Sequence, residues 1–95
     1  HLRYGDIQVD IEKHTALKNG MPVALTPKEF DVLVFFMRNP DVAITREQLL
    51  SNIWGFDFTG ESRSVDIHVQ KVRRKMGLQG KLITIPKLGY RLERR

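Results

Sequence analysis

The sequence predicts an α+β fold with an N-terminal antiparallel sheet, three helices and a C-terminal β-hairpin. Residues 7–25 alternate apolar and polar side chains around Asn19-Gly20, which is typical of strands joined by a tight turn. Residues 26–76 instead carry apolar side chains at helical spacing. Two short apolar runs, at residues 82–85 and 90–92, flank a turn and complete the hairpin.

Size and composition indicate one globular domain that covers residues 1–95. Hydrophobic residues make up 41% of the chain and charged residues 28%, and there is no cysteine for a disulfide or a thiolate metal site. No apolar run approaches the ~20 residues of a membrane span, and no signal peptide is recognisable. The net charge of +5 favours a polyanionic partner. Since the chain begins with His1, we expect a domain excised from a longer protein.

The N-terminal sheet is expected to contain strands at residues 7–12 and 16–18. Asn19-Gly20 is the strongest two-residue hairpin signal, and residues 22–25 are expected to return as the next strand. His14 is isolated from other ligand-type side chains. We therefore expect it to be a solvated strand residue rather than a metal ligand.

Two helices with clear starts are expected in the middle of the chain, the second over residues 45–54. Each begins with a capping box; the first has Pro27 in its first turn and stops at Asn39-Pro40, and the second ends at Gly55. The capping pairs are Thr26 with Glu29 and Thr45 with Gln48. The apolar residues expected to face the core are Phe30, Leu33, Val34, Met37, Leu49, Leu50, Ile53 and Trp54.

A third helix, over residues 63–75, is expected to have two contrasting faces. One face is an apolar stripe for the core, and the other presents cations and an amide, which suits a DNA major groove. A basic face that is merely solvated is the plainer alternative. The stripe consists of Val65, Val69, Val72 and Met76, and the opposite face of Arg63, Ile67, Gln70, Lys71 and Arg74. The second and third helices with the hairpin after them predict a winged helix-turn-helix.

Five blocks of the sequence, in this order, resemble the effector domain of OmpR/PhoB-type response regulators. They are TPKEF (26–30), REQLL with IWG (46–50, 53–55), RSVDIHV (63–69), VRRKM (72–76) and GYRL (89–92), and the match runs from about Tyr4 to Leu92. The resemblance implies a four-stranded N-terminal sheet, three helices and a hairpin wing. It also implies sequence-specific binding of double-stranded DNA at direct repeats by a head-to-tail pair, and control of transcription in the bacterial cytoplasm. A receiver domain, phosphorylated by a sensor histidine kinase, is implied in the full-length protein.

The resemblance assigns DNA contacts to the third helix residue by residue. The residues expected near phosphates are Arg63, His68 and Arg73, and those near base edges are Gln70, Lys71 and Arg74. Gln suits adenine, and Lys or Arg suits guanine. His68 as a packed flank residue stays an alternative. Asp66, the one acid of this helix, is expected to pair with Arg63 or Lys71 rather than to contact a base.

Further DNA contacts are implied outside the third helix, at Thr45, Arg46, Trp54 and Thr84. The start of the second helix can offer N–H groups to a phosphate, and the indole N–H of Trp54 can do the same while its ring packs in the core. The wing departs from the family, because Pro86 and Lys87 stand where many members have Arg-Gly. Pro86 cannot make the minor-groove contact of that arginine, so Lys87 is the expected wing contact.

The loop over residues 55–61 matches the segment that can contact RNA polymerase in this family. The polymerase contacts implied there are Phe56, Asp57, Phe58 and Glu61. At least one of the two phenylalanines is expected to pack into the domain instead.

Other functional classes fit the sequence less well. His1, His14 and His68 are scattered, so we expect neither an enzyme nor a metal site, and no motif indicates a cofactor. A winged helix used for protein–protein contact is the main alternative. RNA binding ranks third, since the strands carry no aromatic stacking platform.

Overall fold

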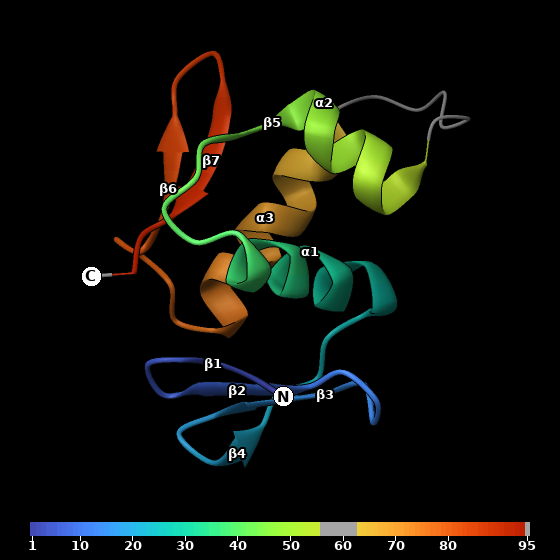
Figure 1. Ribbon diagram of the computed structural model, residues 1–95, viewed down its shortest axis with the longest axis vertical. Coiled ribbons are helices and arrows are strands. Elements are labelled where there is room, and N and C mark those ends of the chain that lie inside the picture. Colours follow the sequence, from blue (N-terminus) through green and yellow to red (C-terminus); the bar gives the residue numbers. More distant parts are fainter. Residues whose placement is uncertain (56–62, 95) are drawn as a thin grey trace.

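The computed structural model describes residues 1–55 and 63–94. Helix α1 lies between the N-terminal sheet on one side and α2 with the C-terminal hairpin on the other (Figure 1). Phe56, Asp57, Phe58 and Glu61 lie outside the described residues. The elements are β1 (Leu2–Tyr4), β2 (Ile7–Asp10), β3 (Thr15–Lys18), β4 (Met21–Pro22), α1 (Pro27–Arg38), β5 (Ile44–Thr45), α2 (Arg46–Leu49), η1 (Leu50–Trp54), α3 (Arg63–Lys75), β6 (Leu82–Ile85) and β7 (Gly89–Leu92).

The N-terminal sheet is antiparallel in the order β1-β2-β3-β4, which confirms the expected hairpin arrangement. Asn19 and Gly20 have φ angles of 53° and 78°, as a type I′ turn requires. The last strand is shorter than expected, Met21–Pro22 instead of residues 22–25. Pro22 offers no N–H to the ladder, and Val23 makes the final bond, to the Ala16 carbonyl (2.9 Å).

Strand β2 ends at Asp10, so the expected strand over residues 7–12 is too long. His14 lies in the turn that follows, with a left-handed φ of 59°, and is therefore not a strand residue. Its ring centroid is 3.8 Å from that of Phe30 on α1. The turn thus packs against α1, a contact between residues too far apart for strand periodicity to indicate.

Both capping boxes are present, which confirms the two predicted helix starts. In each box the threonine hydroxyl accepts the N–H of the third helical residue, whose side chain accepts the threonine N–H. The expected helix over 45–54 is α2 followed by the wider π-helical turn η1. Gly55 closes that turn with φ 99° and donates its N–H to the Leu50 carbonyl (2.8 Å).

The C-terminal hairpin belongs to a three-stranded sheet in the order β5-β7-β6. Strand β5 was not predicted, because two residues show no periodicity. It pairs Ile44 with Tyr90 and Thr45 with Gly89. A Cβ atom on Gly89 would lie 2.0 Å from the Ile44 carbonyl oxygen, so this crossing requires glycine. Strand β5 therefore ties the start of α2 to the wing.

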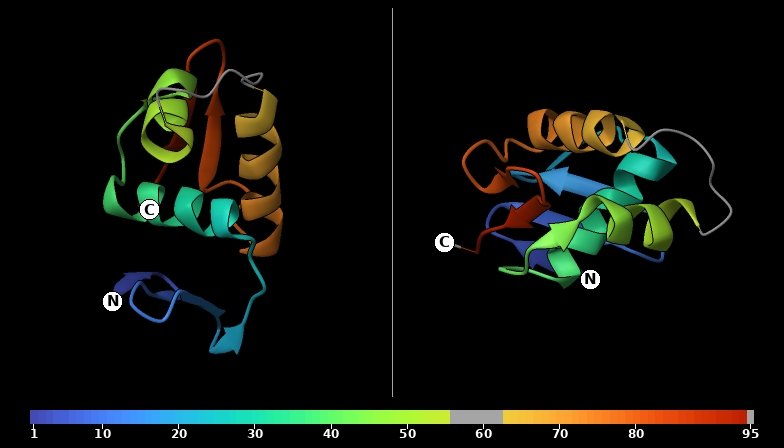
Figure 2. Two further views of the ribbon diagram at one scale, coloured as in Figure 1. Left: turned by 90° about the vertical axis from the view of Figure 1, so that its right-hand side faces the viewer. Right: turned by 90° about the horizontal axis from the view of Figure 1, so that it is seen from above.

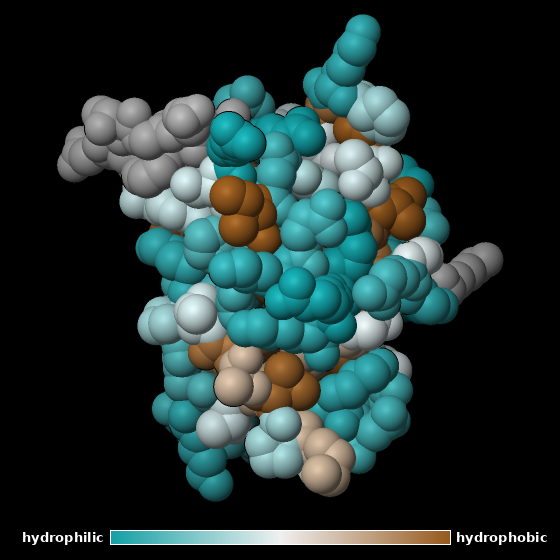
Figure 3. Space-filling view, turned by 180° about the vertical axis from the view of Figure 1, so that it is seen from behind, coloured by the Kyte–Doolittle hydropathy of each residue, from teal (hydrophilic) through white to brown (hydrophobic). Residues whose placement is uncertain are grey.

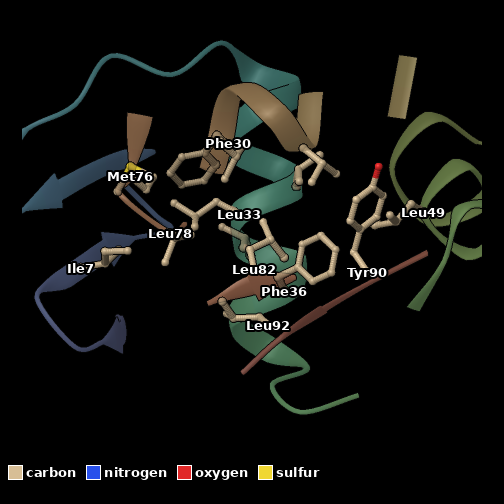
Figure 4. Close-up of a cluster of buried hydrophobic side chains, with 14 of the residues drawn as sticks. Ile7, Phe30, Leu33, Phe36, Leu49, Met76, Leu78, Leu82, Tyr90 and Leu92 are labelled. Carbon is tan, nitrogen blue, oxygen red and sulfur yellow. The ribbon is translucent and has the colours of Figure 1, made fainter. Parts of the chain in front are cut away.

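One hydrophobic core joins the two sheets and the helices, with α1 at its centre (Figure 4). The predicted stripe of α3 is confirmed, since Val65, Val69, Val72 and Met76 are all 0% exposed. On α1 the prediction was too narrow: Met37 is only partly buried, whereas Val32 and Phe36 are fully buried. Because α1 is covered on several sides, core positions there exceed one helical stripe. Within the described residues, no helix has the length and apolarity that crossing a membrane requires.

Candidate nucleic-acid interface

The outward face of α3 carries Arg63, Ile67, Gln70, Lys71 and Arg74, and all five are exposed, as predicted. Within the described residues, the four polar side chains among them make no hydrogen bond or ion pair. Figure 2 shows α3 along one side of the molecule, with the wing beside it. The same side is largely hydrophilic, with isolated apolar spots (Figure 3). The face therefore presents three cations and an amide that have no partner among residues 1–55 and 63–94.

The other side of α3 is held by its apolar stripe and by Lys75. The ammonium Nζ of Lys75 lies 2.7 Å from Oε1 of Glu29 and also donates to the Ala24 carbonyl (3.2 Å). Burial alone would raise the pKa of Glu29. The hydrogen bonds from Lys75 and from the Thr26 N–H, with the charges of Lys75 and Lys71, outweigh burial and lower that pKa. Lys75 is thus a structural cation.

Asp66 joins α3 to α2 and to the wing. Its Oδ1 accepts a hydrogen bond from Nε of Arg46 (2.9 Å) and another from the Tyr90 hydroxyl. The expected partner was Arg63 or Lys71, and that prediction was wrong. Burial, followed by the hydrogen bond to Asp66, raises the pKa of Tyr90 to about 12, so this hydroxyl keeps its proton and donates it.

Two guanidinium groups lie over the ring of Tyr90. The Cζ atoms of Arg46 and Arg73 are 5.3 and 5.9 Å from the ring centroid. Arg73 also donates to the wing strand β6, from Nε to the Leu82 carbonyl (2.8 Å) and from Nη2 to the Thr84 hydroxyl (3.1 Å). Two of the residues expected to contact DNA, Arg73 and Thr84, therefore bind each other.

His68 and Trp54 form a second junction between α3 and the preceding helix. Their rings meet edge to face with centroids 5.1 Å apart, and Nζ of Lys28 lies 5.7 Å from the Trp54 ring. Nδ1 of His68 is 2.7 Å from the Ser64 carbonyl, so it carries the proton. Nε2 then accepts in neutral histidine and donates only in the charged form. Trp54 is half-buried against the core, as expected.

The tip of the wing is the turn Pro86-Lys87-Leu88. Leu88 donates its N–H to the Ile85 carbonyl (3.0 Å), and Lys87 has a φ of 65°. Proline second and a positive φ third are the features of a type II turn, where glycine is usual at the third place. Lys87 therefore has a strained, left-handed backbone conformation, and its side chain is exposed at the tip.

Thr45 is the remaining predicted contact, and residues among 1–55 and 63–94 also line three surface hollows. The Thr45 hydroxyl accepts the Gln48 N–H (3.0 Å), so its observed role is capping. Three hollows in the surface are lined entirely by residues outside α3. In the part of the chain that the structure describes, no group of three or more ligand-type side chains is placed to hold a metal ion.

The central position of Tyr90, which contacts Asp66, Arg46 and Arg73, does not follow from the sequence. The signal available was a tyrosine directly after Gly89 in a strand that pairs with two others. Nothing local indicated that its hydroxyl would meet Asp66, which lies 24 residues earlier.

Comparison with known proteins identifies the family. Residues 20–92 match the family described as "Transcriptional regulatory protein, C terminal". The chain is 38% identical over 96 residues to the sensory transduction protein RegX3 of Mycolicibacterium smegmatis, covering 97% of the chain and 42% of that protein. It is 44% identical over 80 residues to the transcriptional regulatory protein YclJ of Bacillus subtilis, covering 81% and 35%. The chain thus spans less than half the length of these relatives.

Solved structures agree with this assignment. The DNA-binding domain of AdeR, crystallised with an intercistronic region, superposes with a TM-score of 0.84 at 30% identity, and both chains are covered completely. The DNA-binding domain of Bacillus subtilis CssR gives 0.82 at 36% identity, covering 90% of this chain and 98% of that one. The Thermotoga maritima OmpR/PhoB homologue DrrB gives 0.85 at 27%, covering 96% and 43%. The relatives are regulators rather than enzymes. The chain therefore belongs to the OmpR/PhoB-type family of response-regulator effector domains, which are winged-helix DNA-binding domains of transcription regulators.

Proposed function

We propose that this domain recognises specific double-stranded DNA sequences as the output domain of a two-component response regulator. The observation that carries the proposal is the outward face of α3. Arg63, Gln70, Lys71 and Arg74 are exposed there without a partner among the described residues, while the opposite stripe is fully buried. A helix anchored in this way can enter a major groove without repacking the core.

The free side chains suggest a division of roles in the complex. Gln70, Lys71 and Arg74 face the bases, where an amide suits adenine and a cation suits guanine. Arg63 and the wing residue Lys87 face phosphates. Trp54 and His68 are not free, since their rings pack on each other and Nδ1 of His68 bonds the Ser64 carbonyl. We propose that both still add phosphate contacts beside the groove, and His68 donates from Nε2 only when its ring is charged.

Residues with internal partners are proposed to position the interface instead. Arg73 and Thr84 fix the wing to α3, Arg46 is paired with Asp66, and Thr45 caps α2. This assignment departs from the expectation that these four contact DNA. Each would have to give up or share a bond that already satisfies it.

The full-length protein is proposed to carry a receiver domain that a sensor histidine kinase phosphorylates. The support is the length of the relatives, of which RegX3 is covered over only 42%. Two copies are proposed to bind direct repeats head to tail in the bacterial cytoplasm, about one helical turn apart (~10–11 bp). Contact with RNA polymerase through residues 56–61 is part of the same proposal.

A salt series on a duplex tests DNA binding against the protein-contact alternative. The two cations assigned to phosphates, Arg63 and Lys87, predict a slope of log affinity against log salt of about −1.8. A slope near zero contradicts DNA binding and favours a protein partner.

A spacer series tests the pairing separately. Inserting about five base pairs between the half-sites places the second copy on the opposite face of the duplex, and cooperativity is expected to collapse. Undiminished cooperativity, or a preference for inverted repeats, contradicts the head-to-tail arrangement and leaves DNA binding intact.

A further inference from the structure

The Arg46–Asp66 pair lies at the edge of the proposed DNA-binding face. Arg46 begins α2, and Asp66 lies on α3 between the buried stripe and the outward face. Their side chains are 26% and 39% exposed, so both remain within reach of solvent and of a bound polyanion. A cation in this place would ordinarily add one phosphate contact.

Two contacts of Arg46 and one of its partner Asp66 hold Arg46 away from that role. Its Nε donates to Asp66 Oδ1 at 2.9 Å, its guanidinium lies over the Tyr90 ring at 5.3 Å, and the Tyr90 hydroxyl donates to the same Asp66 oxygen. The carboxylate is thus fixed from two sides. Together the Arg46 guanidinium and the Asp66 carboxylate carry no net charge. The pair therefore releases no counterion from DNA.

We propose that Asp66 is a positioning residue that competes with DNA phosphate for Arg46 and so limits sequence-independent affinity. The inference rests on the proposed DNA binding. It explains why the single acid of α3 lies beside a surface that is otherwise cationic. The domain then binds DNA through the cations of α3 and the wing, and Arg46 of α2 neutralises no phosphate.

The test is a double-mutant cycle on a random-sequence duplex, with Asp66→Asn, Arg46→Gln and both together. In Asp66→Asn, Arg46 is released and neutralises one more phosphate, so the salt slope steepens by about 0.9. Between about 50 and 200 mM salt this variant therefore loses about 3.5-fold more affinity than the wild type does. Arg46→Gln does not steepen the slope, and in the double variant, which removes both charges, the slope returns to that of the wild type.

Two controls separate this mechanism from plain charge effects. Glu47→Gln removes an exposed carboxylate one residue from Arg46, and it is expected to leave the slope unchanged. Thermal unfolding of each variant shows that the fold is intact. A second measurement uses the wild type alone: the NMR signal of the Arg46 Nε–H is expected to stay protected from exchange, with and without duplex.

The outcomes are distinguishable. If the double variant, which removes both charges of the pair, has a slope about 0.9 shallower than that of the wild type, Arg46 contacts phosphate in the wild type and the inference is overturned. It is also overturned if Asp66→Asn steepens the slope equally when combined with Arg46→Gln, because Asp66 then acts only by its own repulsion. A wild type that binds no duplex removes the proposed function, and this inference with it.

Discussion

The Nζ atom of Lys75, in the last turn of α3, lies 2.7 Å from Oε1 of Glu29, in the first turn of α1. The same oxygen accepts the Thr26 N–H at 3.0 Å, so one carboxylate caps α1 and anchors α3. The Glu29 side chain is only 2% exposed. This pair orients the proposed recognition helix from its far end, without occupying the outward face.

Glu29→Gln is expected to lower the free energy of unfolding by about 1–3 kcal/mol, because Lys75 loses its charged acceptor while the cap is retained. Urea unfolding measures the change. The matched control is Glu12→Gln, an exposed carboxylate in the turn after β2, which is expected to change stability by less than about 0.5 kcal/mol. Equal effects of the two substitutions would show that the Lys75 pair contributes little.

Stability is expected to fall in acid, with Glu29 as one cause. Its pKa in the folded state lies below the ordinary value of 4.5, so its contribution is complete above that pH and is lost as the pH falls through the lower folded pKa. The Lys18 hydrogen bond lowers the pKa of Asp6 and gives the same sign. Urea unfolding at a series of pH values should show a weaker acid dependence in Glu29→Gln than in the wild type. An unchanged profile would contradict this role.

Two substitutions of Lys87, at the wing tip, separate the effect of backbone strain on stability from the effect of side-chain charge on DNA binding. Lys87 has φ 65°, so Lys87→Gly is expected to be more stable than Lys87→Ala by about 1 kcal/mol. Both lose the same charge, and both should make the salt slope shallower by about 0.9. Thermal unfolding and duplex titration check the two effects. A slope identical to that of the wild type would show that Lys87 lies away from DNA.

The neighbouring residues Arg73 and Arg74 are predicted to differ. Arg73→Ala breaks the bonds to Leu82 and Thr84, so it should cost about 1–2 kcal/mol of stability and weaken binding to all duplexes alike. Arg74→Ala removes an exposed side chain and should leave stability within about 0.5 kcal/mol. It should instead relax the sequence preference at one or two base pairs, because Arg74 is proposed to face the bases. If the unfolding curves of Arg73→Ala and Arg74→Ala coincide, the structural role of Arg73 is contradicted.

Much of the fold followed from local sequence signals. The Asn19-Gly20 turn, the two capping boxes and the α3 stripe depend on residues a few positions apart, and the structure has each of them. Strand β5 did not follow, because two residues have no period and its partner lies on β7. The extra core positions of α1 depend on how many elements surround that helix.

Only part of the candidate site could likewise be predicted from residues close together in the sequence. The outward face of α3 follows from a period of 3.6 residues and was predicted correctly as an exposed set. Which cations are free could not be predicted from that period. Arg46 meets Asp66 across 20 residues, and Lys75 meets Glu29 across 46. The sequence alone therefore could not separate the cations that have internal partners from the exposed ones that have no described partner.

Selection of bound duplexes from a random pool, performed with the wild type and with Lys71→Ala, tests the central claim most directly. The wild type is expected to enrich one motif in direct repeat. Lys71 lies exposed on the proposed reading face, so its variant should lose preference at one or two base pairs, at a cost of about 1–3 kcal/mol on the original site. If the wild type enriches no motif, recognition through the outward face of α3 is contradicted. It is also contradicted if the wild type and Lys71→Ala enrich sites with the same preference at every position.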